Sequence, residues 1–172
     1  IVCFNSINLI GNGFTIPSGP LRDKLNILKK YNIVFINGNE ENLDFFKEII
    51  LKINPKINIF TGKYIPLNLD NFNKNDRYLV FSGIGNHQTF LSMLKSYGIN
   101  IVKEIEFPDH YYYKLSDIKN MMSIANKLNC KILTTEKDFN RVKKYKFEEI
   151  KFVKSELKIS REDDLVKVIL NI

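Results

Sequence analysis

An acid and an imidazole stand side by side at the end of one predicted strand, in the sequence Phe-Pro-Asp-His-Tyr at residues 107–111. Residues 99–106 alternate apolar and polar side chains, which predicts a half-buried strand. The proline lacks a backbone donor and keeps the preceding residue extended, so pairing ends there. Asp109 and His110 therefore lie where α/β proteins commonly place their chemistry, and histidine exchanges protons near neutral pH. The alternative is that Asp109 caps the turn and His110 bonds only locally.

A search for a phosphate-binding loop gives one broken motif. The printed sequence contains no Walker A pattern, G-x-x-x-x-G-K-[ST]. Gly83 and Gly85 lie between a predicted strand and a predicted helix, where free backbone N–H groups can hold an anion. The third glycine of a dinucleotide-binding fingerprint falls on Gln88, so that motif is broken. A nucleotide-binding turn therefore stays an alternative to an ordinary tight turn between strand and helix.

Arg22 follows a glycine-rich stretch, residues 11–13, and the first predicted strand. Pro20 and the apolar spacing of residues 21–28 predict a helix that begins here. A cation in the first turn of a helix opposes the helix dipole. The arginine is therefore a candidate for binding a phosphate or carboxylate through paired N–H donors. The alternative is a salt bridge to a nearby acid.

A second cation in an unfavourable place is Lys137, within Thr-Thr-Glu-Lys-Asp at residues 134–138. This stretch joins a predicted strand to a predicted helix. Thr135 as the N-cap and Asp138 three residues later resemble a capping box with the shorter acid. Capping explains both of those residues. It does not explain the lysine, which opposes the helix dipole as Arg22 does.

The elements that position these residues alternate along the chain. Predicted strands cover residues 1–4, 32–36, 56–67 (one long strand or two short ones), 78–81, 99–107, 131–134 and 150–153. Predicted helices cover residues 21–28, 41–53, a segment ending at 97, 116–128 with Ser116 as N-cap, 135–144, and 160 onward. Gly98 is expected as a left-handed helix terminator. Strands separated by helices predict an α/β fold with a mainly parallel sheet and flanking helices.

Composition sets broad limits. The 172 residues, 44% hydrophobic and 26% charged, are typical of the globular class and allow one domain or two small lobes. Cys3 and Cys130 lie far apart, which argues against a disulfide framework or a zinc site. The net charge of +7 favours acidic partners, but lysine is abundant throughout, so the charge marks no particular surface. The chain begins with Ile1 inside a predicted strand, and we expect it to be the C-terminal part of something longer.

Four pieces of the sequence, in order, resemble motifs of one family. The family is tetraacyldisaccharide 4'-kinase, the lipid A 4'-kinase of Gram-negative bacteria. Its motifs are GNG…PAGPLRE, F-[AS]-G-I-[GA]-[NR], FPDH-[HY] and TTEKD. The similar pieces here are GNG…IPSGPLRD at residues 11–23, FSGIGN at 81–86, FPDHY at 107–111 and TTEKD at 134–138. The resemblance spans residues 1 to about 153.

The resemblance implies a kinase that uses ATP and Mg²⁺ to phosphorylate the 4'-hydroxyl of a tetraacylated glucosamine disaccharide 1-phosphate, the lipid A precursor. It implies a peripheral enzyme at the cytoplasmic face of the inner membrane, with no nucleic acid as partner. The implied fold is a P-loop α/β lobe and a second, Rossmann-like α/β lobe, with the active site in their cleft. On this view residues 1–55 are the remainder of the P-loop-type lobe and residues 56–172 form the C-terminal lobe.

The family motifs also imply roles for single residues. His110 matches a histidine that supports the general base, an aspartate in the N-terminal half of the family, and Asp109 is its catalytic neighbour. Arg22 matches an arginine near the site of phosphate transfer. Asp23 stands where the family has glutamate, which shortens that arm. The remaining candidates for phosphate or substrate binding are Asn12, Gly13 and Lys137, and no metal ligand is expected.

Parts of the family pattern are absent from the printed sequence. The family's Walker A loop, its metal-binding acidic pair and its membrane-associating N-terminal helix all precede the position of Ile1. Phosphoryl transfer depends on positioning ATP and neutralising its charge, so we expect this chain alone to be incompetent as a kinase. The alternative function is non-catalytic: a folded remnant, or a basic module that binds anionic lipid or nucleic acid.

Overall fold

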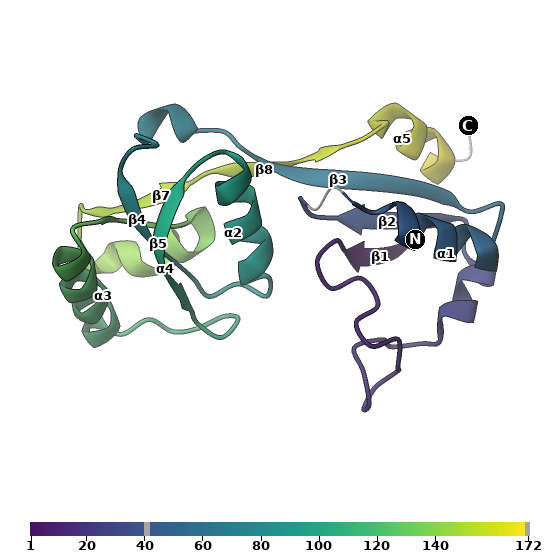
Figure 1. Cartoon of the computed structure of the whole chain (residues 1–172), viewed down its shortest axis with the longest axis horizontal. Helices are drawn as coiled ribbons and strands as arrows, with labels where there is room; N and C mark the ends of the chain where they lie inside the picture. Colours follow the sequence, from purple (N-terminus) through teal and green to yellow (C-terminus); the bar gives the residue numbers. More distant parts are fainter. Residues whose placement is uncertain (40–41, 171–172) are drawn as a thin grey trace. The chain divides into compact units, whose positions relative to one another are not determined.

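The computed structural model describes residues 1–39 and 42–170 and divides into two compact units. The first unit is Ile1–Tyr64 with Leu157–Ile172, and the second is Ile65–Glu156. Figure 1 traces the order of the elements along the chain. The division differs from the expected boundary after residue 55. The strand that follows residue 55 pairs with the first unit's sheet, and residues 155–159 form the strand next to it in the same sheet.

The first unit is built on a sheet with the strand order β1-β2-β3-β8, in which β1, β2 and β3 pair in parallel. Neighbouring residues of β2 serve opposite faces, because strand side chains alternate. Val34 packs with Phe46 and Ile50 of α1, whereas Ile33 packs with Leu165 of α5. The elements are β1 (Val2–Asn5), η1 (Leu25–Lys30), β2 (Ile33–Asn37), α1 (Asp44–Ile53), β3 (Asn58–Pro66), β8 (Ser155–Ile159) and α5 (Glu162–Leu170).

The second unit is a four-stranded parallel sheet with the order β5-β4-β6-β7. Residues 78–81 of the central strand β4 are hydrophobic and buried, as expected of a strand covered on both faces. Ile118 and Met121 of α3 pack against it. The elements are η2 (Leu69–Asn71), β4 (Arg77–Ser82), α2 (His87–Ser96), β5 (Asn100–Glu106), α3 (Leu115–Leu128), β6 (Lys131–Thr135), α4 (Glu136–Val142), η3 (Lys143–Tyr145) and β7 (Ile150–Val153).

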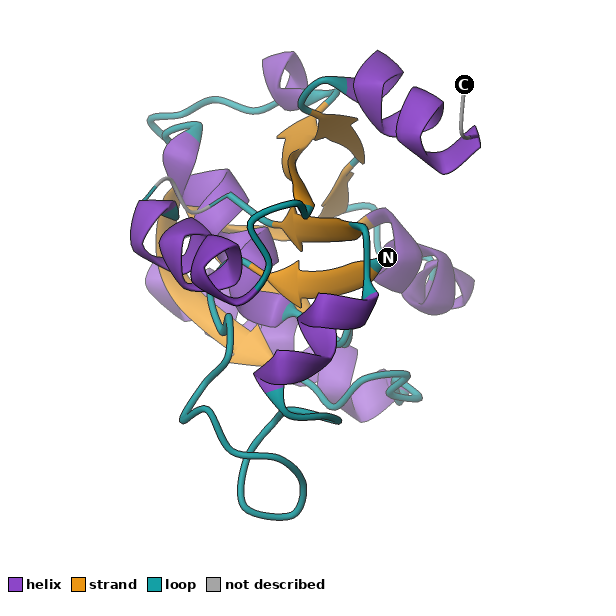
Figure 2. Ribbon diagram, turned by 90° about the vertical axis from the view of Figure 1, so that its right-hand side faces the viewer, coloured by secondary structure: helices purple, strands orange, loops and turns teal. Residues whose placement is uncertain are grey.

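The order of these strands determines where a site can form. From β4 the chain moves to β5 on one side, then crosses to β6 on the other side of β4. Open α/β sheets bind ligands outside the carboxyl ends of the strands at such a reversal of strand order. The ends of β4, β5 and β6 lead into the three motifs at residues 81–86, 107–111 and 134–138. Figure 2 shows the strands and helices from a second direction.

The predicted helix over residues 21–28 is wrong. The backbone N–H of Ile16 donates to the carbonyl of Leu21 (2.9 Å), and Leu21 N–H donates to the carbonyl of Phe14 (3.2 Å), which holds Leu21 in a bridge beside Thr15. Only the short 3₁₀ helix η1 forms, from Leu25. Arg22 therefore lies outside any helix, and the helix-dipole argument for it does not apply.

Smaller differences have local causes. Helix α3 has Lys114, not Ser116, at its N-cap, because the Asp117 carboxylate accepts the Lys114 backbone N–H (2.8 Å). Strand β8 was not predicted, and the final helix begins two residues after the expected residue 160. The predicted start of α1 at Glu41 lies outside the described residues. Gly98 adopts the predicted left-handed conformation, with φ of +81°. None of the helices in the described part of the chain combines the length and apolar character of a membrane span.

Candidate functional site

His110 lies in a group of side chains and backbone atoms at the carboxyl ends of β4, β5 and β6. We call Gly83, Asp109, His110, Asp138 and Arg141 the His110 cluster. Its members come from the turn after β4, the loop after β5 and the helix after β6. The cluster therefore lies at the reversal of strand order described above.

Gly83 supports both the loop and the helix of this cluster. Its carbonyl accepts the backbone N–H of His110 (3.2 Å) and Nη1 of Arg141 (3.0 Å). Its own N–H donates to Oδ2 of Asp138 (3.0 Å). A Cβ at this position would lie 2.8 Å from the hydroxyl of Tyr113. Only glycine therefore fits here without displacing its neighbours.

Asp138 is the anchor of the cluster. The residue is fully buried, and its carboxylate accepts the hydroxyl of Thr135 (2.8 Å) and the guanidinium of Arg141 (3.0 Å). Its backbone N–H donates to Thr135 Oγ1 (3.0 Å), so the predicted N-cap is confirmed. A buried carboxylate needs a cation and several donors to offset its lost hydration. Arg141, Thr135 and the Gly83 N–H supply them.

His110 is presented to solvent by this anchored frame. Its side chain is 74% exposed, and Nη2 of Arg141 lies 3.3 Å from its Nδ1. The φ angle of His110 is +60°, a backbone conformation that residues other than glycine rarely adopt. Its N–H is shared between the Gly83 carbonyl and the Asp109 carboxylate. The ring is thus exposed on a backbone that the rest of the cluster holds in place.

Asp109 is close to the imidazole without a direct hydrogen bond to the ring. Its Oδ2 lies 3.8 Å from His110 Nε2, and Oδ1 accepts the His110 backbone N–H (2.9 Å). The carboxylate also approaches the turn after β4, since a Cβ at Gly85 would lie 3.3 Å from Oδ2. The local capping role considered above is therefore present. The same carboxylate remains half exposed beside the imidazole.

Two buried polar side chains lie beneath the turn after β4. The hydroxyl of Ser82 and Nδ1 of His87 are 2.6 Å apart, and both residues are buried. Burial lowers the pKa of His87 below 6.5, against the opposing influence of the Glu106 and Glu104 carboxylates. Burial and the nearby Asp138 charge raise the pKa of Tyr113. The imidazole of His87 and the hydroxyl of Tyr113 are therefore neutral at pH 7, and they support the turn structurally.

Lys137 belongs to the same unit but not to the His110 cluster. It lies in the first turn of α4, as predicted, and it is exposed. None of the described acids forms an ion pair with it. Lys137 therefore does oppose the helix dipole, as the sequence suggested, and its role in binding stays a prediction.

In the first unit, Asn12 shapes the loop that follows β1. Its side-chain amide donates to the carbonyl of Ser18 (2.8 Å), and its oxygen accepts the N–H of Phe14 (3.1 Å). Gly13 has a φ of +79° and open space where a Cβ would stand. These contacts give Asn12 a structural role in the loop. Gly13 is exposed and is therefore accessible to a ligand.

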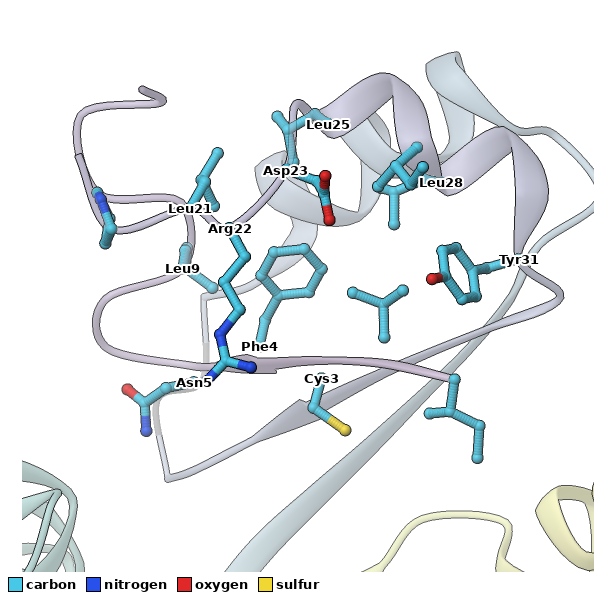
Figure 3. A pocket seen from close by; sticks show the side chains of 14 residues that line it. Cys3, Phe4, Asn5, Leu9, Leu21, Arg22, Asp23, Leu25, Leu28 and Tyr31 are labelled. Carbon is cyan, nitrogen blue, oxygen red and sulfur yellow. The ribbon is translucent and has the colours of Figure 1, made fainter. Parts of the chain in front are cut away.

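Arg22 and Asp23 line a cavity of about 580 Å³ in the first unit, beside β1 and η1. Figure 3 shows the guanidinium of Arg22 directed toward Asn5 and Cys3, with Asp23 above the cavity. Both charged residues are exposed. The alternative of a salt bridge is not supported, because no acid in the described part of the chain pairs with Arg22. Its donors remain available to an anion.

The structure thus separates the predicted residues into two groups. Asp109 and His110 are neighbours in the second unit, whereas Asn12, Gly13, Arg22 and Asp23 belong to the first. Sequence reasoning missed Arg141 and assigned Asp138 only a capping role. The signal available was their spacing of three residues on one helix, which brings opposite charges together. The contact of Arg141 with His110 joins residues 31 positions apart and has no local signature.

The residues that the structure describes do not form a metal site. The described part of the chain holds no group of three or more His, Cys, Asp or Glu side chains that could bind a metal ion. The carboxylate of Asp138 is occupied by Arg141 and Thr135. The described residues therefore do not fit Mg²⁺.

Comparison with known proteins gives a consistent result. A family model described as tetraacyldisaccharide-1-P 4'-kinase matches residues 1–172. A tetraacyldisaccharide 4'-kinase of Pelagibacter ubique (strain HTCC1062) is 54% identical over 172 residues, which are 100% of this chain and 55% of the relative. A protein of the same name from Rickettsia canadensis (strain McKiel) is 40% identical over 143 residues, 81% of this chain and 41% of the relative. The chain spans about half the length of the curated relatives it matches.

Among solved structures, the "apo" form of LpxK from Aquifex aeolicus in complex with ATP is similar in fold. The TM-score is 0.53 at 20% sequence identity, and the match covers 98% of this chain and 50% of that one. At this identity the likeness concerns the fold alone. It agrees with the parallel strand pairing and confirms the predicted α/β class.

Proposed function

Because the chain belongs to the tetraacyldisaccharide-1-P 4'-kinase family, we propose that it supplies part of a lipid A 4'-kinase. The reaction transfers the γ-phosphate of ATP to the 4'-hydroxyl of a tetraacylated glucosamine disaccharide 1-phosphate. The observation that carries this proposal is the His110 cluster. It presents an exposed imidazole beside a carboxylate at the carboxyl ends of three parallel strands.

In this proposal His110 assists removal of the proton from the attacking hydroxyl. A hydroxyl becomes a better nucleophile when a base within hydrogen-bonding reach, directly or through one water molecule, accepts its proton. An exposed imidazole can take part in such a transfer near neutral pH. A histidine can support that base without taking the proton itself, by donating a ring N–H to the carboxylate and fixing the direction of the carboxylate. His110 therefore acts together with a carboxylate base of the full enzyme.

Arg22 is proposed to bind an anionic group of the nucleotide or of the saccharide phosphate. Its guanidinium is permanently charged and offers several donors to an oxyanion. Its exposure at the edge of a cavity supports this role. Asn12, Gly13 and Asp23 are assigned to phosphate or substrate binding in the same loop, and Lys137 to phosphate or substrate binding from the second unit. The proposal also includes Mg²⁺, which residues of the full enzyme outside this chain would hold, and peripheral contact with the inner membrane from the cytoplasmic side.

The test is His110→Ala in a polypeptide that joins this chain to a P-loop half of the family. General acid–base groups contribute about 10²- to 10⁴-fold to rate, so kcat for ATP-dependent 4'-phosphorylation is expected to fall by about that factor. Lys119→Ala is the control, since Lys119 is exposed on α3 and its loss is expected to leave kcat unchanged. An unaltered kcat in His110→Ala would remove the role assigned to His110.

The competing function is a basic module that binds anionic lipid or nucleic acid. Binding of this kind weakens steeply as salt rises, because it depends on counterion release. Salt-sensitive binding of the chain to anionic vesicles or DNA, with no preference for the saccharide, would favour this module over the kinase. Binding that requires the tetraacylated disaccharide with its free 4'-hydroxyl would favour the kinase.

A further inference from the structure

The guanidinium of Arg141 makes different contacts through its two terminal nitrogens. Nη1 donates to the Asp138 carboxylate and to the Gly83 carbonyl, each at 3.0 Å. Nη2 lies 3.3 Å from Nδ1 of His110. The first two contacts fix the guanidinium on a buried anchor, because Asp138 is fully buried. The third contact joins this fixed guanidinium to the exposed ring of His110.

The chemistry of arginine determines the form of the histidine. A guanidinium carries only donors and stays protonated in proteins. A hydrogen bond between Nη2 and Nδ1 therefore requires Nδ1 to be the acceptor, with its lone pair free. A neutral imidazole holds one proton, so that proton must lie on Nε2.

We propose that Arg141 is a positioning residue that holds His110 in the tautomer protonated at Nε2 and fixes the direction of that N–H. The Nε2 atom is the one that faces Asp109, with Oδ2 at 3.8 Å. The proton-bearing edge of the ring is thereby directed to the carboxylate side. The importance of this tautomer for phosphoryl transfer depends on the function proposed above. The tautomer itself does not.

The arrangement requires arginine rather than any cation. A lysine at residue 141 could neutralise Asp138, but a single ammonium group is a compact point charge on a flexible stem. Held at the buried carboxylate, it has no second rigid arm to reach His110. Arg141→Lys thus separates the structural role, which is neutralising Asp138, from the positioning role.

The experiment uses the full chain labelled with ¹⁵N at histidine. Long-range proton–nitrogen correlation spectra distinguish protonated from unprotonated ring nitrogens, and His110→Gln assigns the two rings. In the unsubstituted chain His110 is expected to carry its proton on Nε2 alone. In Arg141→Lys the form protonated at Nδ1 is expected to become measurable in a chain that remains folded. Arg141→Met, which also unpairs Asp138, is a second variant whose folding is checked by the same spectra.

The matched control is Lys143→Gln, which removes one positive charge from the same segment. Lys143 bonds to Asn140 (3.0 Å) and not to His110, so the His110 tautomer is expected to stay unchanged. A His110 ring protonated at Nδ1 in the unsubstituted chain would overturn the proposal. Tautomer populations that are identical in the unsubstituted chain and in Arg141→Lys would overturn it as well.

A kinetic measurement separates this inference from the proposed function. In the joined enzyme, Arg141→Lys is expected to lower kcat by about 10-fold, part of the full acid–base contribution, with little change in KM for ATP. If the tautomer responds to Arg141→Lys but neither that variant nor His110→Ala lowers kcat, the positioning inference holds and the kinase role of His110 fails. If His110→Ala is inactive and the tautomer does not respond, the kinase role holds and the positioning inference fails.

Discussion

Buried polar residues in the second unit do more than the exposed ones to define the site. Asp138 holds the helix start, the turn after β4 and the guanidinium through one carboxylate. Removing one partner of such a pair leaves an uncompensated buried charge, which costs several kcal/mol. The exposed imidazole of His110 needs such a frame, because an unsupported side chain would spread over many rotamers.

The buried pair of Ser82 and His87 leads to a prediction about pH. Burial lowers the pKa of His87 from 6.5 in the folded chain, whereas the unfolded chain keeps the ordinary value. Between these two values the unfolded chain binds the additional proton, so acid favours unfolding. Stability contributed by neutral His87 is full above about pH 6.5 and is lost as pH falls through the lowered pKa, at up to about 1.4 kcal/mol per pH unit.

The measurement is urea unfolding between pH 7.5 and 5.0 for the unsubstituted chain, His87→Gln and His110→Gln. We expect the slope of stability against pH to flatten in His87→Gln and to persist in His110→Gln, because His110 is exposed. Equal slopes in the unsubstituted chain and His87→Gln would show that His87 is not the group responsible.

At the scale of the elements, local sequence predicted the second unit better than the first. The strand and the capped helix within residues 131–142 have strong local signals, and both formed. The segment 21–28 has the apolar spacing of a helix, but backbone pairing between Thr15 and Leu21 holds its start extended. Tertiary pairing thus overrode local propensity. Strand β8 was missed because it is short and mostly exposed, and its two apolar residues, Leu157 and Ile159, are too few to establish a period.

The same contrast applies to the site. Pro108 predicts the end of a strand, and β5 does end at Glu106, so the placement of Asp109 and His110 followed from sequence. The contact of Arg141 with His110 depends on how the loop after β5 meets the helix after β6. Only the folded sheet brings those two segments together.

The turn after β4 gives a prediction at this scale. A Cβ at Gly83 would lie 2.8 Å from the hydroxyl of Tyr113, a buried ring that cannot move aside. A Cβ at Gly85 would lie 3.3 Å from the half-exposed Asp109 carboxylate, which can. We therefore expect Gly83→Ala to lose about 1–3 kcal/mol of stability by overpacking. Gly85→Ala is expected to change stability by less than about 0.5 kcal/mol.

Urea unfolding of both variants measures the difference, and the histidine spectra report whether the loop carrying His110 has moved. Equal stability of the two variants would contradict the close packing of Tyr113 on Gly83. A destabilised Gly83→Ala with an unshifted His110 resonance would show that the turn does not support the loop.

At the scale of the whole molecule, chain order and compact units do not coincide. The second unit is one continuous segment, Ile65–Glu156, with its own apolar core. The first unit is completed by residues from the far end of the chain. The sequence predicts one lobe for residues 56–172, because the order of elements cannot show that the last helix returns to the first sheet.

That return gives the final prediction. Leu165 of α5 is 7% exposed and packs on Ile33 and Phe60, which are 5% and 2% exposed. Removing residues 157–172 would uncover both partners and delete the hydrogen bond from Ser160 N–H to the Thr61 carbonyl (2.8 Å). Residues 65–156 lose none of their own core. Hydrogen exchange of the shortened chain is therefore expected to lose protection in β2 and β3 and keep it in β4 and β6.

Leu165→Ala provides a milder form of the same test in the full chain. Truncating a buried leucine costs about 2–5 kcal/mol, and the loss is expected only in the first unit. Ile169→Ala is the matched control, since Ile169 is 48% exposed on the same helix and its truncation should cost less than about 0.5 kcal/mol. If protection fell equally in β2 and β4 of Leu165→Ala, the two units would unfold together and the last helix would stabilise the whole chain. If protection fell in β2 alone, the two units would have separate stabilities, because each buries its own core.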